Sequence, residues 1–251
     1  MMEDTLEEIK NFFYVQRELY GSKRILSVDL KDQPGESYTP VKKIPDQPAK
    51  ASPDTSKSEP VREKSVMYSD HPLVKFYHDI RQCQKCVLGQ SRTHFVFGTG
   101  NPDADLMFVG EAPGRDEDLQ GKPFVGRAGQ LLTVMLQAID LKRENVFIAN
   151  VLKCRPPNNR DPLPEEIEKC EPYLIKQIEL IKPKLIVALG RFASASLLRT
   201  KVALATLRED IHDYNGVPLI VTYHPAALLR NPQIKADAWE DLKKIKAYLR
   251  Q

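Results

Sequence analysis

The segment KLIVAL at 184–189 is one of four apolar runs that decide the fold of this chain. The other three are DLMFV at 105–109, VFIANV at 146–151 and VPLIVTY at 217–223. Each run is almost continuously apolar, which is typical of strands that are covered on both faces. We therefore expect these runs to form a four-stranded, mainly parallel sheet.

Helical patterns separate and follow the strand runs, and they occupy 126–140, 164–182, 191–198 and 236–250. Alternation of strands and helices indicates the α/β class, so we expect a three-layer α/β/α fold. Ligands of such folds bind beyond the carboxyl ends of the strands. The residues that follow each strand run are therefore the first candidates for a functional site.

The N-terminal quarter of the chain differs in composition from the rest. Positions 32–65 hold six Pro, six acidic and six basic residues, so they cannot bury enough apolar surface to order themselves, and we predict a disordered linker. Within 1–31, Thr5 and Glu8 form a capping box for a short amphipathic helix. That helix is either a loosely docked terminus or a tethered peptide that binds a protein partner. Positions 66–251 are predicted to form one globular domain.

Charge and hydropathy exclude several classes of protein. The 251 residues include 37 basic and 34 acidic side chains, a formal net charge of +3, which is compatible with nucleic acid but not diagnostic. No apolar run approaches the roughly 18–20 residues that span a bilayer, so we expect no membrane segment. The first 20 residues carry early acids and no cleavage signal, so we expect a cytoplasmic location.

Loops rich in glycine and proline follow the apolar run at 105–109. They read GEAPGRDED at 110–118 and GKPFVGRAG at 121–129, and they match neither a Walker loop nor GxGxxG. Small residues of this kind let backbone amides approach a ligand closely. At the end of the run at 146–151, the side chain of Asn150 offers one hydrogen-bond acceptor and two donors, enough to read an amide-like edge.

The last run is followed by HPAALLR at 224–230. Its apolar centre beside an arginine indicates either a short helix packed on the core or a wedge. The alternatives stay open at this point.

All four cysteines fall in the globular part, as Cys83-x2-Cys86 followed by Cys154 and Cys170. A CxxC pair with two further cysteines suggests four thiolates on one metal centre. Structural zinc and an iron–sulfur cluster both use four cysteines, and the spacing does not decide between them. A third interpretation is that the CxxC pair has a redox role or that the four thiols are unrelated.

Taken together and in order, these motifs resemble family 4 of the uracil-DNA glycosylase superfamily, the iron–sulfur enzymes of bacteria and archaea. The resemblance covers residues from about 76 to 250 and rests on the CxxC pair, GEAPGRDED, GKPFVGRAGQLL, NVLKCRPPNNRDP, Cys170 and HPAALLR. It implies a glycosylase catalytic domain at 66–251, and a 4Fe–4S cluster held by Cys83, Cys86, Cys154 and Cys170.

The same resemblance assigns roles to single residues. It implies that Phe124 stacks on uracil, that Asn150 reads the pyrimidine edge and that His224 lies beside the uracil O2. The full set of implied uracil-binding residues is Gly110, Glu111, Ala112, Glu117, Phe124, Asn150 and His224. The implied catalytic residues are His224, Glu111 and Asn159.

Ala112 stands where the better-known family 1 enzymes have a water-orienting Asp. Leu228 and Leu229 are candidates for filling the space that a flipped base leaves in the stack, and Arg230 for holding a phosphate.

The implied reaction is hydrolysis of the bond between uracil and its sugar, which leaves an abasic site for base excision repair of deaminated cytosine. The expected partner is uracil-containing DNA, double- or single-stranded, bound by a monomer that is associated with the nucleoid. The alternative is a cluster-stabilised DNA-damage-binding or polymerase-associated module with little catalysis. A zinc-stapled nucleotide hydrolase lacks the metal-ligating carboxylates that it needs.

Overall fold

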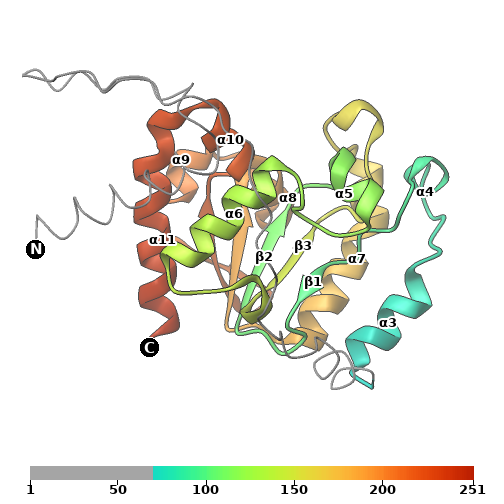
Figure 1. The fold of residues 1–251 in the computed structure, drawn as a ribbon, viewed down its shortest axis with the longest axis horizontal. Coiled ribbons are helices and arrows are strands. Elements are labelled where there is room, and N and C mark those ends of the chain that lie inside the picture. Colours follow the sequence, from blue (N-terminus) through green and yellow to red (C-terminus); the bar gives the residue numbers. More distant parts are fainter. Residues whose placement is uncertain (1–69) are drawn as a thin grey trace, which may run out of the picture. The chain divides into compact units, whose positions relative to one another are not determined.

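A computed structural model describes residues 70–251, and Figure 1 shows their fold. The helix predicted within 1–31 and the linker predicted at 32–65 lie outside the described residues and stay predictions. The described part is an α/β domain whose sheet has helices on both sides (Figure 1).

The sheet has six strands in the order β1-β3-β2-β4-β6-β5. The inner four strands run parallel to one another, and the two edge strands run antiparallel to their neighbours. The strands are β1 (Thr99–Gly100), β2 (Leu106–Gly110), β3 (Phe147–Asn150), β4 (Leu185–Leu189), β5 (Ile211–Tyr214) and β6 (Val217–Thr222).

The four predicted runs are the four parallel strands, so the fold class is confirmed, but the strand count of four was too low. Strand β1 has only two residues, which is too short to show a period in the sequence. Strand β5 reads IHDY and is largely exposed, so it lacks an apolar run. Its sequence signal is the turn Asn215-Gly216, where both residues have positive φ, as the hairpin from β5 to β6 requires.

The predicted helices are present with bounds that shift by only a few residues. The α-helices are α3 (Pro72–Ile80), α4 (Leu88–Ser91), α5 (Arg115–Gln120), α6 (Arg127–Ala138), α7 (Pro164–Ile181), α8 (Gly190–Leu198), α9 (Leu204–Leu207), α10 (Pro225–Arg230) and α11 (Lys235–Leu249). Short 3-10 turns occupy η2 (Arg143–Asn145), η3 (Pro157–Asn159) and η4 (Pro232–Ile234).

The inner strands are buried on both faces, as their apolar runs predict. Met107 and Val109 on β2 and Ile186 and Ala188 on β4 belong to one core cluster that also includes side chains of α7 and α8. The alternate residue Phe108 is likewise buried, with 0% exposure. A sheet covered on both sides leaves its strand ends as the place where polar side chains can gather.

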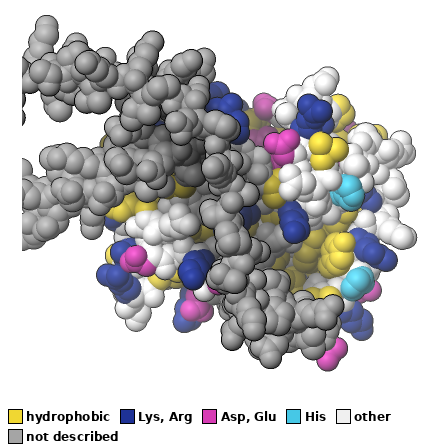
Figure 2. All heavy atoms as spheres, in the orientation of Figure 1, with side chains coloured by type: hydrophobic (Ala, Val, Ile, Leu, Met, Phe, Trp, Pro, Cys, Tyr) yellow, Lys and Arg dark blue, Asp and Glu magenta, His cyan; other side chains and the backbone are white. Residues whose placement is uncertain are grey.

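No helix in the part of the chain that the structure describes is both long and apolar enough to cross a membrane. Figure 2 shows basic and acidic side chains interspersed on the visible face of the described residues, together with apolar ones. On this face, charge alone does not point to one binding surface.

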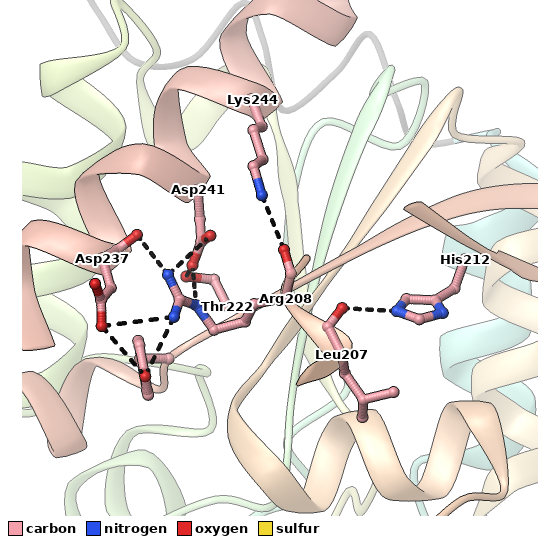
Figure 3. Close-up of polar contacts among 8 residues, drawn as sticks. Leu207, Arg208, His212, Thr222, Asp237, Asp241 and Lys244 are labelled. Atoms are coloured by element: carbon pink, nitrogen blue, oxygen red, sulfur yellow. Dashed lines mark hydrogen bonds and ion pairs between the residues drawn. The ribbon is translucent and has the colours of Figure 1, made fainter. Parts of the chain in front are cut away.

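An ion pair joins Arg208, which follows α9, to the last helix, and the end of β6 is bonded to the same carboxylate (Figure 3). Arg208 donates to both carboxylate oxygens of Asp241 on α11, over 2.7 and 3.1 Å, and Asp241 is only 1% exposed. The hydroxyl of Thr222 donates to the same carboxylate over 2.7 Å, and Arg208 also donates to the Tyr223 hydroxyl. The network therefore fixes the residues that lead directly to His224.

Replacing Asp241 by Ala is expected to lower the free energy of unfolding by about 2–3 kcal/mol, because the guanidinium of Arg208 and the buried hydroxyl of Thr222 both lose their carboxylate acceptor. Urea denaturation followed by circular dichroism measures this. Asp105, which forms an exposed pair with Lys184, is the matched control. Its change to Ala is expected to cost no more than about 1 kcal/mol, and equal losses at both positions would contradict the prediction.

Candidate functional site

A cavity of about 540 Å³ opens at the carboxyl ends of the parallel strands. Its walls come from the segments that follow β2, β3, β4 and β6, which is where an α/β fold places its ligands. Among the residues that line it are Gly114, Glu117, Ala128, Asn159, Asp161, Arg191, Phe192, Ala227 and Arg230.

Three side chains predicted from separate strand ends share this cavity. Phe124, Asn150 and His224 all line it, and the rings of Phe124 and His224 lie 5.4 Å apart between centroids, inclined by 33°. Gly110 at the end of β2 makes this convergence sterically possible. A Cβ at that position would lie 2.6 Å from the Phe124 ring and would overlap the Asn150 side-chain oxygen.

The side-chain oxygen of Asn150 is a buried acceptor without a hydrogen-bond partner among the described residues. The residue is 1% exposed. An unsatisfied buried acceptor costs roughly 1–3 kcal/mol, and nearly all such groups in native proteins are paired. Because Asn150 also lines the cavity, its oxygen is placed to accept from an N–H group of a ligand.

His224 is held as a neutral imidazole with a defined proton position. It is the N-cap of α10, and its Nδ1 accepts from the N–H of Ala226 over 3.1 Å. The ring proton therefore resides on Nε2, which is free to donate. Burial and, secondarily, the charge of Arg230 lower the pKa of His224 to about 4. Gly190 allows the close approach, since a Cβ there would lie 2.7 Å from that of His224.

The loop that carries Phe124 is fixed by a carboxylate and a guanidinium. Phe124 has a positive φ of 52°, which strains a residue with a side chain. One carboxylate oxygen of Glu117 accepts from the N–H groups of Val125 and Gly126 over 2.9 and 3.0 Å, and Arg143 donates to the carbonyl of Pro123 over 2.9 Å. Glu117 lines the cavity as predicted, but this oxygen is occupied in holding the loop.

The remaining polar groups of the cavity surround Glu111. Burial, followed by repulsion from Asp161, raises the pKa of Glu111 to about 7, and the charge of Arg191 opposes the shift. Asn159 also lines the cavity, and its side-chain oxygen accepts from Arg155 over 2.7 Å. Ala112 contributes only a methyl group to the wall, so the carboxylate next to it in the sequence is that of Glu111.

The segment HPAALLR forms the short helix α10, so the first of its two sequence readings applies. Leu228 is 0% exposed and belongs to the interior, so its side chain is not available to enter a base stack. Leu229 is half-buried and Arg230 is exposed, with Arg230 at the cavity wall. The structure therefore separates the two leucines, which the sequence treated as equivalent.

The four cysteines line one small hollow, although they come from three separate segments. Cys83 and Cys86 lie between α3 and α4, Cys154 follows β3, and Cys170 lies within α7 as predicted. No three Cys, His, Asp or Glu side chains among residues 70–251 come close enough together to hold a single metal ion. The thiols surround a space instead of converging on a point.

Hydrogen-bond donors point at the sulfur atoms of this hollow. Arg92 donates to Cys154 over 3.3 Å, the Tyr173 hydroxyl donates to Cys83 over 3.2 Å, and the Lys153 N–H donates to Cys170 over 3.3 Å. Hydrogen bonds to sulfur are among the features that tune iron–sulfur sites in proteins. Burial raises the pKa of both inner thiols, that of Cys170 to about 12, so any metal group bound there would have to supply the energy of their deprotonation.

Several residues of the site were missed by the sequence analysis. Gly190, Arg191 and Phe192 line the cavity at the end of β4, yet no site residue was predicted after that strand run. Ligands of α/β folds bind beyond the carboxyl ends of the strands, and this rule, if applied also to the run at 184–189, would have identified these residues. Asp161 was seen only as part of the motif at 154–162, because its effect on Glu111 is a matter of three-dimensional proximity.

Comparisons with known proteins agree with this geometry. The profile of the uracil DNA glycosylase superfamily matches residues 97–243. The type-4 uracil-DNA glycosylase of Archaeoglobus fulgidus is 50% identical over 175 residues, which cover 66% of this chain and 88% of that protein. The type-4 uracil-DNA glycosylase of Thermotoga maritima is 43% identical over 190 residues, which cover 74% of this chain and 99% of that protein.

The chain therefore belongs to the uracil DNA glycosylase superfamily, and its α/β fold agrees with that membership. Within the superfamily it groups with the type-4 uracil-DNA glycosylases, as its resemblance to family 4 predicted.

The neutral state of His224 is directly measurable. We expect its imidazole to titrate near pH 4, and we expect Arg230→Ala to raise that pKa because a nearby positive charge is removed. Nuclear magnetic resonance of labelled histidine follows the titration and reports the proton on Nε2. The distant change Arg199→Ala serves as the control and should leave the titration unmoved. A His224 that titrates near 6.5 in the wild type would contradict the assignment.

Proposed function

We propose that this protein is a uracil-DNA glycosylase, which extrudes uracil from DNA and hydrolyses the bond between its N1 and the sugar C1′. The observation that carries the proposal is the unpartnered acceptor of Asn150, which lies in the same cavity as the Phe124 ring and the His224 imidazole. One flat ligand with an N–H group and carbonyl oxygens on its rim satisfies all three side chains.

The hydrogen-bond donor and acceptor of uracil match the acceptor and donor of the Asn150 amide. Its N3–H donates to the side-chain oxygen, and its O4 accepts from the side-chain NH₂ group. Cytosine presents an acceptor at N3 and a donor at position 4, so it leaves polar groups unpaired at both atoms. A site built on hydrogen bonds discriminates strongly against a ligand that lacks the matching groups. This supports selection of uracil over cytosine by Asn150.

Extrusion of the base costs free energy, and binding of the base in the cavity offsets part of it. Removing a base from the stack costs a few kcal/mol, and stacking on an aromatic ring contributes roughly 1–3 kcal/mol per base. Phe124 supplies that ring. Leu229 is the leucine of α10 with accessible side-chain surface, so we assign it the role of filling the vacated space, and Arg230 the role of holding a phosphate.

Cleavage places negative charge on uracil and positive charge on the sugar. As the bond to C1′ breaks, its electron pair leaves with N1 and spreads to O2. The Nε2–H of the neutral His224 imidazole then donates to O2, because Nδ1 already accepts from the backbone and the ring proton is therefore on Nε2. A preorganised donor at a developing oxyanion is typically worth about 100- to 1000-fold in rate.

Water completes the reaction at C1′, and its proton must be removed. Ala112 has no group that can take part. We assign the orientation of the water to Glu111 and Asn159, which line the cavity on the side of Asp161. Ionised Glu111 also stabilises the cationic sugar, because opposite charges attract across a partly desolvated site. An oxocarbenium-like sugar needs only a weak base for the final proton transfer.

The cysteine hollow supports a 4Fe–4S cluster on Cys83, Cys86, Cys154 and Cys170. Four buried or half-buried thiols around one space, with donors aimed at three of them, fit such a group. When bound, the cluster ties α7 and the loop after β3 to the CxxC loop, and its contribution is to stability. The protein partner of 1–31 and the monomeric state remain predictions.

The decisive experiment is incubation with a labelled oligonucleotide that contains one uracil, followed by alkali to cleave abasic sites. Strand cleavage is expected with the wild type, and His224→Ala and Asn150→Ala are expected to be at least about 100-fold slower. Binding to the oligonucleotide without any cleavage would favour the damage-binding module instead. Cleavage that persists unchanged in both variants would refute the assigned site.

The rate of uracil release should depend on the ionisation of Glu111. Because the pKa of Glu111 is raised to about 7, the carboxylate forms only as the pH rises through that value, and the single-turnover rate should rise with it. Glu111→Gln is expected to be slow and to show no inflection near pH 7. A wild-type rate that falls as the pH rises from 6 to 8 would reverse the sign and exclude this role.

Purification without air is expected to yield a brown protein with about four irons per chain. Cys170→Ser should lose the visible absorbance and lower the unfolding temperature, because the buried thiolate is a ligand. Ser196→Ala on α8, outside the hollow, is the control and should keep both properties. Stoichiometric zinc in a colourless wild type would exclude the cluster.

A further inference from the structure

Lys153 is a completely buried lysine that belongs neither to the cavity nor to the cysteine set. It is 0% exposed, a state that lysine almost never adopts without partners. Its Nζ donates to the main-chain carbonyl of Asn150 over 2.7 Å and to the side-chain oxygen of Gln177 over 2.6 Å. One of the two hydrogen bonds of the Lys153 amine is therefore to the backbone of Asn150, the residue assigned to read uracil.

The carbonyl of Asn150 needs this partner because, among residues 70–251, no strand lies beside it. The N–H of the same peptide, that of Val151, donates to Gly110 on β2 over 2.9 Å. Because the peptide is planar and trans, its carbonyl points to the opposite side. On that side β1 pairs with β3 only at Phe147 and Ile148, so the sheet ends before it reaches Asn150. Lys153 thus holds the peptide from one side while Gly110 holds it from the other.

The same lysine is anchored to the helix that carries a cysteine of the hollow. Gln177 lies on α7 and donates to the carbonyl of Phe97 over 2.9 Å, which fixes its side chain. Cys170 lies on the same helix, and its sulfur accepts from the N–H of Lys153 over 3.3 Å. A continuous set of hydrogen bonds therefore runs from the cysteine hollow through Lys153 to the end of β3.

We propose that Lys153 is a positioning residue that sets the orientation of Asn150 by clamping its carbonyl, and so links the cysteine-bound group to uracil recognition. The proposal rests on the proposed function, since it concerns the residue that reads the base. A displacement of about 1 Å in a positioned group can cost about 100-fold in rate. The loss of one clamp at the peptide of Asn150 is a displacement of this kind.

The test uses the full-length protein with its cluster and the change Lys153→Met, which keeps an unbranched chain but removes the donors. We expect kcat/KM on the uracil oligonucleotide to fall about 10- to 100-fold, with a loss in kcat, while iron content and visible absorbance stay those of the wild type. Amide exchange at Val151 should accelerate, while that at Val187 on β4 should not. The exposed Lys184→Met is the matched control and should behave as the wild type.

A double-mutant cycle separates positioning from general stability. If Lys153 acts through the Asn150 side chain, Lys153→Met causes no further loss in an Asn150→Ala background. Losses that multiply in the double variant would overturn the proposal. If Lys153→Met is purified without iron, Gln177→Leu replaces it in the same cycle, since it removes the second anchor of the amine without a change next to Cys154. Multiplying losses there would overturn the proposal equally.

If the wild type releases uracil and the losses from Lys153→Met and Asn150→Ala multiply in the double variant, only the role of Lys153 is refuted. A wild type that releases no uracil would remove the proposed function, and this inference with it.

Discussion

The parallel pairing of β3, β2, β4 and β6 is the constraint on which the rest of the structure depends. It brings four carboxyl strand ends to one edge, so that side chains separated by more than a hundred positions in the sequence line one cavity. The convergence also requires residues without side chains. Gly110 leaves room for Asn150 and Phe124, and Gly190 leaves room for His224. Buried strands supply the rigidity, and the two glycines supply the space.

The electrostatics of the cavity divide its groups by role. His224 is kept neutral by burial and by Arg230, whereas Glu111 is kept near its midpoint at neutral pH by burial and by Asp161. In the proposed reaction, the neutral donor of His224 and the titratable carboxylate of Glu111 suit a base that leaves as an anion and a sugar that becomes a cation. Neither property is visible in the composition of the chain, whose charges are almost balanced.

The sequence predicted the part of the molecule that depends on apolar periodicity and on motif order. The four inner strands and the four main helices follow from apolar runs and helical patterns, whereas the shared position of Phe124, Asn150 and His224 was implied by the resemblance to family 4. The edge strands did not follow, because β1 is too short and β5 is too polar to show a run. Contacts between distant segments were also hidden. Nothing near Lys153 in the sequence indicates that its amine meets Gln177, and nothing in HPAALLR indicates which leucine faces inward.

The start of helix α10 has a consequence for how the histidine keeps its proton in place. In many enzymes a carboxylate orients the catalytic imidazole, and its negative charge raises the basicity of the ring. Here the amide of Ala226, a group that opens the helix in any case, performs the orientation without adding charge. In the proposed reaction, the pyrimidine anion therefore departs toward an imidazole whose Nδ1 is bonded to a helix N–H instead of a carboxylate, so the start of the helix sets the tautomer.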